Sequence, residues 1–454
     1  MSVIVMKFGG TSVADAEKIR AAARRANDAR KQGYQVVMVV SAMGKSTDQL
    51  VDLAGQITDN PPKREMDQLL ATGEQVTISL MAMALEEMGA EAISFTAGQI
   101  GIVTDDVHTK ARIKRIDIRR LREALDAGKV VIVAGFQGVT ETGAITTLGR
   151  GGSNVTLVAL AAALNAEMCE NYTDVDGIYT ADPRMVPNAR KLQRISYDEM
   201  LELASLGAGV LHNRAVEFAK KYNVPIHVRS SLNNRKGTMI VAETQDMERI
   251  VVSGAALKDR LARVTLREVP DRPGVAAKVF HTMASNHIVV DDIIQTTDES
   301  GRATVSFTVE LDDLPDAKKV VEKLCDELGS NPLYEDHLAK VSVVGVGMRV
   351  HTGVAERMFE ALAAAGINIE NITTSEIKLS CLINRDEGAK ALRLVHDAFD
   401  LGEGGRKARV PKTAQAGRKK SGRKKSAKKS AGKSPKKSAK KSSRKRKSKS
   451  RKKK

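Results

Sequence analysis

Residues 1–240 alternate short β-branched runs with segments of helical periodicity, and this alternation narrows the possible folds more than any other feature. The runs include VIVMKF at 3–8, VVMVV at 36–40 and VVIVAG at 130–135, with stretches such as ADAEKIRAAARRANDARKQG between them. Strands that alternate with helices pair in parallel, because a crossover helix returns the chain to the same end of the sheet. We therefore expect an α/β fold with a central, mostly parallel sheet covered on both faces. Ligands of such sheets bind at the carboxyl ends of the strands, so the loops there are the first candidates for a site.

A gap-free internal repeat occupies much of residues 250–400. PGVAAKVFHTMASNHIVVDDIIQT aligns with TGVAERMFEALAAAGINIENITTS at an offset of 79 residues, and Gly274 and Ile293 coincide with Gly353 and Ile372. Each copy reads as strand, glycine turn, amphipathic helix, strand, strand and helix. The repeat predicts two ferredoxin-like modules of βαββαβ order after the parallel-sheet domain. The expected boundaries are 1–245, 250–335 and 336–402.

The C-terminal residues 403–454 differ in composition from everything before them. Residues 406–454 contain 26 lysines and arginines and no acidic residue, while the whole chain has a net charge of +18, so the preceding residues sum to −8. Like-charge repulsion and the absence of any apolar period predict a disordered Lys/Arg/Ser-rich tail. Its charge predicts salt-sensitive, nonspecific contact with nucleic acid or another polyanion.

Cysteine usage and hydropathy bear on the compartment. Cys169, Cys325 and Cys381 lie in apolar segments at spacings that fit neither a disulfide framework nor a zinc site, so we expect buried, reduced thiols. No apolar run approaches the ~20 residues that a membrane span needs. The pattern indicates a cytoplasmic protein without a membrane partner.

Two glycine loops are candidate phosphate sites. The first strand leads Lys7 into Gly9 and Gly10, where backbone amides and an ammonium group suit an anion, although KFGGTS alone is also an ordinary tight turn. LGRGGSN at 148–154 precedes an apolar helix and combines Arg150 with a helix N-terminus. The alternative is that Ser153 or Asn154 only caps that helix.

Acidic residues give weaker signals. TDVDGIYTADPR at 173–184 holds three aspartates that suit Mg²⁺ or nucleotide hydroxyls, but Asp-Gly and Asp-Pro are also common in turns. ATGEQ at 71–75 is expected to start a long helix, with Glu74 in its first turn. Taken alone, such a glutamate only complements the helix dipole.

Six motifs, taken in order, closely resemble the aspartate kinases of the amino-acid kinase family. They are MKFGGTSV, VVSAMGKSTDQL, ATGEQVTISLMA, GFQGVTETGAITTLGRGGS, YTDVDGIYTADPR and VPIHVRSS. The internal repeat resembles the tandem ACT domains of those enzymes, so the likeness covers residues 1–402 and excludes the tail. It implies ATP-dependent phosphorylation of the side-chain carboxylate of L-aspartate to 4-phospho-L-aspartate, with ATP and Mg²⁺, for lysine, threonine and methionine biosynthesis.

The resemblance also implies roles for particular residues. The catalytic positions are Lys7 and Asn154. The nucleotide positions are Lys7, Phe8, Gly9, Gly10, Thr173, Asp174, Tyr179 and Arg184. The aspartate positions are Ser41, Thr47, Glu74, Arg150, Gly151, Gly152 and Ser153. Arg150 suits a carboxylate, and Glu74 suits the ammonium group.

Feedback regulation is implied by the ACT resemblance. Lysine, threonine or both are the expected effectors, and the family pairs its ACT sheets between subunits, which implies a homo-oligomer. The effector positions are Asp271, Gly274, Ala276, Asp291 and Gln295 in the first module and Asn368 and Ile369 in the second. Met247 is a candidate internal start for a separate regulatory subunit.

Three positions depart from the family pattern. Asn154 stands where GRGGSD has an acidic residue, Gly209 replaces the lysine of a GAK-type motif, and Ala355 replaces a hydroxyl residue in HTGVA. Asparagine keeps hydrogen bonds but not charge. We expect an active enzyme. The alternative is a weak or inactive kinase homologue that binds nucleic acid through its tail. Another amino-acid kinase, such as a glutamate kinase, fits the tandem repeat and the ATGEQ and YTADPR segments less well.

Overall fold

The computed structural model describes residues 1–207, 210–243, 250–299 and 301–402. The predicted tail at 403–454, Gly209 and Met247 lie outside these residues.

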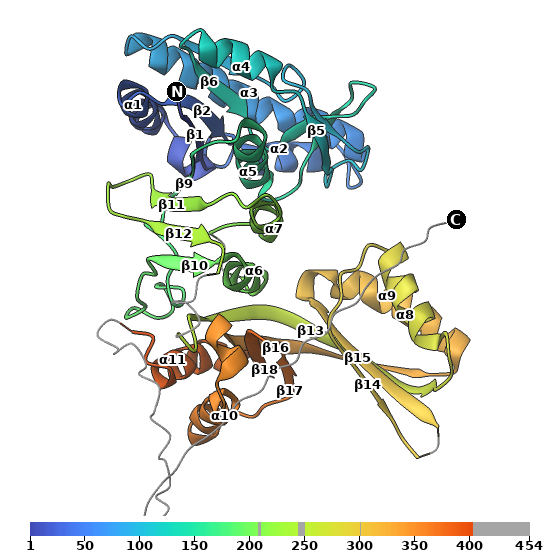
Figure 1. The fold of residues 1–454 in the computed structure, drawn as a ribbon. Coiled ribbons are helices and arrows are strands. Elements are labelled where there is room, and N and C mark those ends of the chain that lie inside the picture. Colours follow the sequence, from blue (N-terminus) through green and yellow to red (C-terminus); the bar gives the residue numbers. More distant parts are fainter. Residues whose placement is uncertain (208–209, 244–249, 300, 403–454) are drawn as a thin grey trace, which may run out of the picture. The chain divides into compact units, whose positions relative to one another are not determined.

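A mostly parallel sheet forms the centre of residues 1–243 (Figure 1). Its strand order is β10-β12-β11-β9-β1-β2-β6-β3, and neighbouring strands are parallel except β11 and β12. The predicted parallel α/β sheet is therefore confirmed. The strands are β1 (Val3–Phe8), β2 (Gln35–Val40), β3 (Ala92–Phe95), β6 (Val130–Ala134), β9 (Met168–Thr173), β10 (Arg194–Ser196), β11 (Ile226–Ser230) and β12 (Thr238–Val241).

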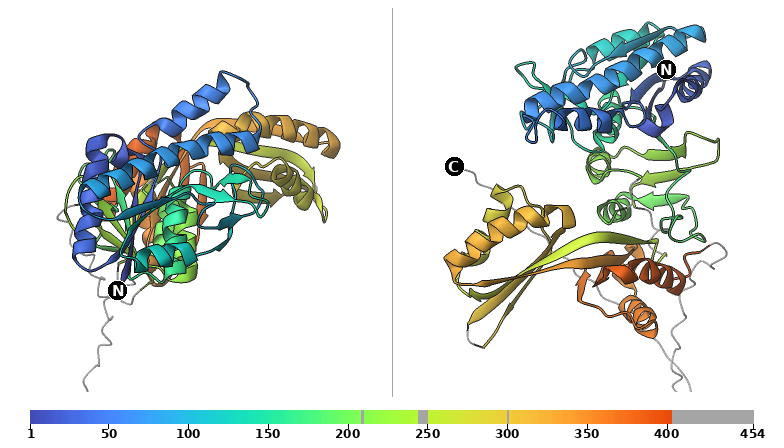
Figure 2. Two further views of the ribbon diagram at one scale, coloured as in Figure 1. Left: turned by 90° about the horizontal axis from the view of Figure 1, so that it is seen from above. Right: turned by 180° about the vertical axis from the view of Figure 1, so that it is seen from behind.

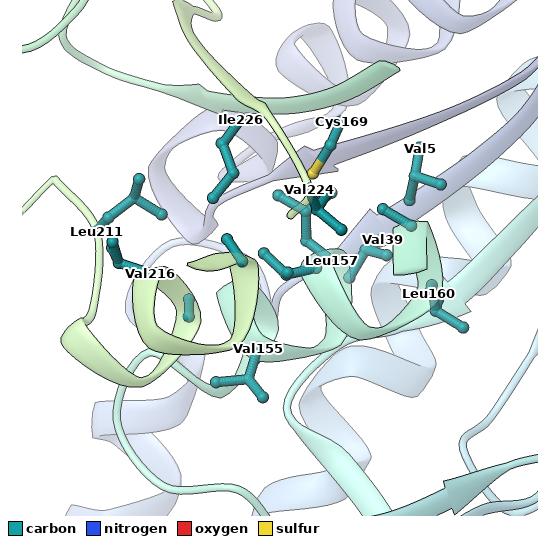
Figure 3. Packing of buried hydrophobic residues seen from close by; sticks show 14 of the residues in the cluster. Val5, Val39, Val155, Leu157, Leu160, Cys169, Leu211, Val216, Val224 and Ile226 are labelled. Carbon is teal, nitrogen blue, oxygen red and sulfur yellow. The ribbon is translucent and has the colours of Figure 1, made fainter. Parts of the chain in front are cut away.

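Helices cover both faces of this sheet because side chains along each strand point alternately to the two sides. Val5 belongs to the apolar layer under α5, whereas Met6 belongs to the layer under α1 and α3. Figure 3 shows the first layer, where Leu157 and Leu160 of α5 lie near Val5 and Val39 of the sheet. The helices are α1 (Ala16–Lys31), α2 (Ser46–Gly55), α3 (Lys63–Glu87), α4 (Arg119–Asp126), α5 (Gly152–Leu164), α6 (Tyr197–Ser205) and α7 (Asn213–Tyr222), with the short 3₁₀ helix η1 (Gly10–Val13).

A small sheet of order β5-β4-β7-β8 leads into the Arg150 loop. Its last strand ends at Thr147, three residues before Arg150, so the position of this strand fixes where that loop begins. The strands are β4 (Ile102–Thr104), β5 (Ile113–Ile116), β7 (Gln137–Val139) and β8 (Ile145–Thr147).

The internal repeat folds into one continuous antiparallel sheet of order β14-β15-β13-β16-β18-β17. The long strands β13 and β16 run through both modules (Figure 2), so residues 254–258 pair with 340–344 of the second module. Helix placement and strand order follow the predicted βαββαβ pattern, but the two modules share strands. The elements are β13 (Gly254–Pro270), α8 (Val275–Ser285), β14 (Asp291–Thr297), β15 (Arg302–Glu310), η2 (Leu311–Asp313), α9 (Leu314–Leu328), β16 (Asn331–Val344), η3 (Val346–Val350), α10 (Val354–Ala364), β17 (Asn371–Thr374), β18 (Lys378–Asn384), η4 (Arg385–Glu387) and α11 (Gly388–Ala398).

Repeat-equivalent glycines occupy equivalent turns. Gly274 precedes α8 with φ 95°, and Gly353 precedes α10 with φ 89°. Both lie in the left-handed region, which a residue with a Cβ adopts only at a cost. The gap-free alignment of the sequence is therefore matched by backbone conformation.

Cysteine state and helix hydropathy were also predicted. Cys169, Cys325 and Cys381 are buried and free, which confirms that prediction. Within the described ranges, no helix combines the length and apolar character needed to cross a bilayer.

Candidate active site

The end of β1 carries Lys7 into a turn that needs its glycines. A Cβ on Gly10 would lie 2.9 Å from the carbonyl oxygen of Ala42, and one on Gly9 would lie 3.3 Å from the Lys7 Nζ. Lys7 is 8% exposed. Burial lowers the pKa of Lys7 to about 8, although the charge of Asp174 opposes that shift. A poorly solvated ammonium group next to a tight backbone turn gains much from a phosphate partner.

Phe8 presents only its main chain to this turn. Its ring is fully buried and stacks on Tyr172 with the centroids 4.7 Å apart. Its carbonyl oxygen accepts a hydrogen bond from the N–H of Ser41 at 3.2 Å. Any contact of Phe8 with a nucleotide would therefore come from the backbone.

The loops after β9 and β11 are tied to the loop after β1. Thr173 Oγ1 donates to Asp174 Oδ1 at 2.9 Å, and the Thr173 carbonyl accepts from the N–H of Ser231 at 2.8 Å. The hydroxyl of Ser231 accepts from Ser12 Oγ at 2.8 Å. Thr173 and Asp174 are thereby held at the same edge of the sheet as Lys7.

The rest of the 173–184 segment makes internal pairs. Tyr179 donates its phenol to Asp176 Oδ1 at 2.5 Å, and Lys191 pairs with Asp176 Oδ2 at 3.1 Å. Arg184 pairs with Asp182 at 2.6 Å and remains 88% exposed. No group of three His, Cys, Asp or Glu side chains within the described ranges has the arrangement of a metal site. The described aspartates of this segment therefore do not form a metal cluster. Asp176 is paired with the side chains of Tyr179 and Lys191, and Asp182 accepts from the N–H of Arg184 as in a turn.

Glu74 lies in the middle of α3, so the prediction that it belongs to the first turn of a helix is wrong. The helix begins at Lys63, directly after Pro61 and Pro62, because KREMDQLL continues the helical pattern upstream of ATGEQ. Glycine at position 73 is required, since a Cβ there would lie 2.8 Å from that of Ala42. Glu74 is thus a buried side chain on a rigid element and no helix cap.

The Glu74 carboxylate is only half satisfied. Its Oε1 accepts from the N–H of Ala42 at 3.0 Å, and its buried Oε2 has no hydrogen-bond partner among the described residues. Burial raises the pKa of Glu74 to about 7, against the opposing hydrogen bond from Ala42. A cationic ligand would relieve this cost of burial.

The loops after β2 and before α5 meet at two serines. Ser41 Oγ donates to Ser153 Oγ at 2.9 Å, across 112 residues of sequence. Thr47 is half-buried in the first turn of α2, next to this loop in sequence. Three of the residues implied for aspartate, Ser41, Glu74 and Ser153, are thereby joined through residues 41–42.

The Arg150 loop delivers an uncapped helix N-terminus. Helix α5 begins at Gly152, and its N-cap Gly151 has φ 73° with no side-chain cap, so neither Ser153 nor Asn154 is the cap. A Cβ on Gly151 would lie 2.4 Å from the Cβ of His212, and one on Gly152 would lie 2.9 Å from Phe136 Cδ2. Arg150 is exposed to solvent. Both glycines are therefore needed for packing.

Two asparagines bring unpartnered polar atoms to this side of the sheet. Asn154 is 8% exposed and its Oδ1 lacks a partner among the described residues. The same holds for both amide atoms of Asn171, which is fully buried on β9 in register with Lys7. Sequence reasoning missed Asn171, although an amide inside the buried strand MCENYT was a usable signal.

The candidate effector residues fall into two groups. Asp271 accepts from Gln295 Nε2 at 3.4 Å, and Gly274 and Ala276 lie at the start of the following helix. Asp291 instead pairs with Lys340 at 2.7 Å. In the second module, Asn368 Nδ2 donates to Glu370 at 2.9 Å and Ile369 packs on the apolar core. Among the described residues, no hydrogen bond joins the candidate effector residues of the first module to those of the second.

Comparisons with known proteins agree over nearly the whole folded region. The chain matches the amino acid kinase family over residues 2–230 and the ACT domain over residues 264–329 and 341–399. An aspartokinase of Geobacillus stearothermophilus is 53% identical over 403 residues, which cover 89% of this chain and 98% of that protein.

Two solved structures of E. coli aspartokinase III are similar in fold. The complex with aspartate and ADP, in the R-state, has a TM-score of 0.75 at 26% identity and covers 87% of this chain and 99% of that chain. The complex with lysine and aspartate, in the T-state, has a TM-score of 0.67 at 27% identity, with coverages of 87% and 99%.

Proposed function

Because this chain belongs to the amino acid kinase family, and within it to the aspartokinases, we propose that the loops around Lys7 and Glu74 bind ATP and L-aspartate side by side. The enzyme transfers the γ-phosphoryl group of ATP to the side-chain carboxylate of aspartate, giving 4-phospho-L-aspartate and ADP. This is the first step of lysine, threonine and methionine biosynthesis.

The observation that carries the proposed site is the position of residues 41–44. Gly44 donates its N–H to the carbonyl of Gly10 at 3.0 Å, Ala42 donates to Glu74, and Ser41 donates to Ser153. One short loop therefore contacts the phosphate turn, the candidate ammonium ligand and the start of α5. Two substrates bound to these elements would be held next to each other, which is the main requirement of phosphoryl transfer.

On the nucleotide side, Lys7, Gly9 and Gly10 hold the phosphates, and Phe8 contributes its main chain. Thr173, Asp174, Tyr179 and Arg184 border the nucleotide. A carboxylate oxygen of aspartate bonds to the γ-phosphorus while the bond from that phosphorus to the β,γ-bridging oxygen breaks. Lys7 stabilises the charge on the phosphoryl oxygens. No protein nucleophile is needed.

On the aspartate side, Glu74 holds the ammonium group and Arg150 holds a carboxylate through two parallel hydrogen bonds. Ser41, Thr47 and Ser153, with the backbone of Gly151 and Gly152, complete the pocket. The unpartnered Oε2 of Glu74 supports this assignment. Asn154, in the first turn of α5, supplies a neutral amide whose Oδ1 has no partner among the described residues.

Mg²⁺ fits this site as a companion of the nucleotide. Asp174 is the acidic residue whose charge acts on Lys7. A single carboxylate together with phosphate oxygens is a usual way for proteins to hold Mg²⁺. When bound, the ion neutralises phosphate charge.

Feedback control through the ACT domains is proposed with lysine, threonine or both as effectors. The lysine complex of E. coli aspartokinase III supports lysine in particular. Asp271, Gly274, Ala276, Asp291 and Gln295 would bind the effector from the first module, and Asn368 and Ile369 from the second.

A homo-oligomer through the ACT sheet is supported by exposed apolar residues on both edge strands. Ile293 on β14 and Ile372 on β17 are 53% and 45% exposed. They occupy equivalent positions of the repeat, and an exposed strand edge with apolar side chains favours pairing with another chain.

The tail at 403–454 is proposed to contact polyanions without sequence preference. The enzyme is proposed to be cytoplasmic.

The deciding experiment is ADP release by the purified protein with Mg-ATP, with and without aspartate. Aspartate-dependent turnover that persists after deletion of residues 403–454 would support the assignment. ATP binding without turnover, in a folded protein, would instead favour an inactive kinase homologue that acts through its tail. Lysine and threonine added singly and together identify the effector.

A further inference from the structure

Helix α3 carries a second buried carboxylate, Asp67, that the reaction itself does not use. Asp67 is fully buried. Its Oδ1 accepts from the hydroxyl of Thr147 at 2.6 Å, and its Oδ2 accepts from the Nδ1 of His108 at 2.7 Å. The N–H of Thr109 lies 3.1 and 3.0 Å from the two oxygens. A buried carboxylate with this many donors holds its partners in a fixed geometry.

The partners of Asp67 are the supports of the Arg150 loop. Thr147 ends β8, three residues before Arg150. The Thr109 carbonyl packs against the same loop, since a Cβ on Gly149 would lie 3.0 Å from that oxygen. Ala111 closes the connection by donating its N–H to the Thr147 carbonyl at 3.0 Å.

Arg214 also stabilises the loop that carries Arg150. Its guanidinium donates to the carbonyl of Leu148 at 2.5 Å and to the carbonyl of Ala111 at 2.9 Å. The chain that leads into Gly149 is therefore held at Thr147 by the carboxylate of Asp67 and at Leu148 by the guanidinium of Arg214. Arg150, which is exposed, projects from a fixed base.

The same helix holds the opposite end of the proposed aspartate pocket. Asp67 and Glu74 are seven residues apart on α3. Seven residues of α-helix span about 10 Å and bring the second side chain almost back to the face of the first. One rigid helix thus supports Glu74 directly and Arg150 through Asp67 and Thr147.

We propose that Asp67 is a positioning residue that sets the spacing between Arg150 and Glu74, and thereby selects an amino-dicarboxylic acid of the length of aspartate. This rests on the proposed function, in which Glu74 and Arg150 bind the two ends of the substrate. A longer substrate such as glutamate, with one more methylene, would not satisfy both ends while presenting its side-chain carboxylate to ATP.

The test compares Thr147→Val with Thr147→Ser in the full-length enzyme. The valine variant removes the hydroxyl that Asp67 accepts from but keeps the volume, and the serine variant keeps the hydroxyl. We expect the valine variant to raise KM for aspartate about tenfold or more, because small misplacements of a substrate-binding group are costly. KM for ATP and the thermal midpoint should change little, and Thr147→Ser should retain the parent KM for aspartate.

The Asp67→Asn variant, provided that it folds, is a second test of the positioning role. It should raise KM for aspartate at least as much as Thr147→Val and narrow the preference for aspartate over glutamate. A folded Thr147→Val enzyme with the parent KM for aspartate would overturn the proposal, as would a Thr147→Ser enzyme that fails equally.

The proposed pocket is checked separately with Arg150→Gln and Glu74→Gln. If neither raises KM for aspartate, the pocket assignment itself fails. If both raise it while Thr147→Val does not, only the positioning role of Asp67 fails.

Discussion

The hydroxyl of Thr180 lies 3.0 Å from Nε2 of His396 and so joins the 173–184 segment to the second ACT domain. Both side chains are fully buried. The Thr180 hydroxyl also donates to the carbonyl of Leu401 at 3.1 Å, so it accepts from an N–H at Nε2 of His396. Burial lowers the pKa of His396 against the opposing charge of Asp397, and this shift favours the neutral ring.

His396→Leu is expected to weaken feedback inhibition. The segment around Thr180 is proposed to border the nucleotide, so a contact with α11 gives the ACT region a direct connection to it. Removing the hydrogen bond should raise the lysine concentration for half-inhibition about fivefold or more, the scale of a modest allosteric coupling. Initial rates measured across a lysine titration, at fixed ATP and aspartate, give this number.

His337→Gln is the matched control for that variant. His337 is 55% exposed on β16 and pairs with Asp386 at the surface, so its loss should leave inhibition unchanged. Equal inhibition curves for His396→Leu and the parent enzyme would show that coupling takes another route.

Glu74→Gln is expected to stabilise the unliganded protein at alkaline pH while weakening aspartate binding. The pKa of Glu74 is raised from 4.5 to about 7, so the folded state holds this proton more tightly than the unfolded state. The resulting stabilisation is complete below pH 4.5 and is lost as the pH rises through 7. At pH 8 the neutral glutamine should therefore raise the unfolding free energy by about 3 kcal/mol. Urea unfolding at pH 8 and pH 5 measures the difference, which should shrink at the lower pH.

Glu87→Gln, at the exposed end of the same helix, should show no such pH dependence. The substrate readout is independent. For the parent enzyme, kcat/KM for aspartate should fall as the pH drops below 7, because a protonated Glu74 loses its attraction for the ammonium group. A flat profile between pH 6 and 8 would contradict the proposed role.

Asn154→Asp is expected to raise kcat/KM for ATP at alkaline pH. Burial lowers the pKa of Lys7 to about 8, so the parent enzyme should lose activity as the pH rises through that value and the ammonium charge disappears. Side chains alternate along β1, so Lys7 faces the same side of the sheet as Val5, the side on which α5 packs. A carboxylate in the first turn of α5 should therefore favour the charged lysine. The alkaline limb of the pH–rate profile should move upward by about half a pH unit or more.

Asn165→Asp adds the same charge at the other end of α5, about 16 Å away. It should leave the limb in place. An Asn154→Asp profile that overlays the parent would show that position 154 does not act on Lys7.

Much of the fold could be predicted because its signals are local. Val5 and Met6 lie in adjacent positions of a continuous apolar run and face two different helical layers, as a doubly covered strand requires. Gly274 and Gly353 align in sequence and share a left-handed conformation. The turn after β1 could be located for the same reason, since Lys7, Phe8, Gly9 and Gly10 are consecutive in sequence.

The features that the sequence did not predict depend on contacts between residues distant in sequence. Asp67 looks like a solvent-facing residue of an amphipathic helix, but its donors lie 41 to 80 residues further along the chain. Glu74 was expected in the first turn of a helix that starts at ATGEQ, but the helix begins at Lys63, and close packing against Ala42 requires Gly73 inside it. Both modules share β13 and β16, and this sharing depends on pairing between strands that are distant in sequence, so local patterns could not predict it.

Lys340→Met is expected to destabilise the ACT region. Lys340 is 2% exposed on β16 and pairs with Asp291 and Asp292, at 2.7 Å each. Burial alone would lower the pKa of Lys340, but the two carboxylates raise it, so the ammonium charge is retained. Without it, Asp292, whose side chain is 8% exposed, becomes an unpaired buried charge. Such a loss costs about 3 kcal/mol or more.

Calorimetry of Lys340→Met against Lys319→Met separates this effect from the loss of any lysine. Lys319 pairs with Asp316 on α9, but both side chains are at least 74% exposed, and such surface pairs contribute less than about 1 kcal/mol. Adding Asp292→Asn to Lys340→Met should recover part of the loss, because it removes the unpaired buried charge. A double variant no more stable than Lys340→Met would mean that packing of the lysine stem, and not charge, anchors β14 to β16.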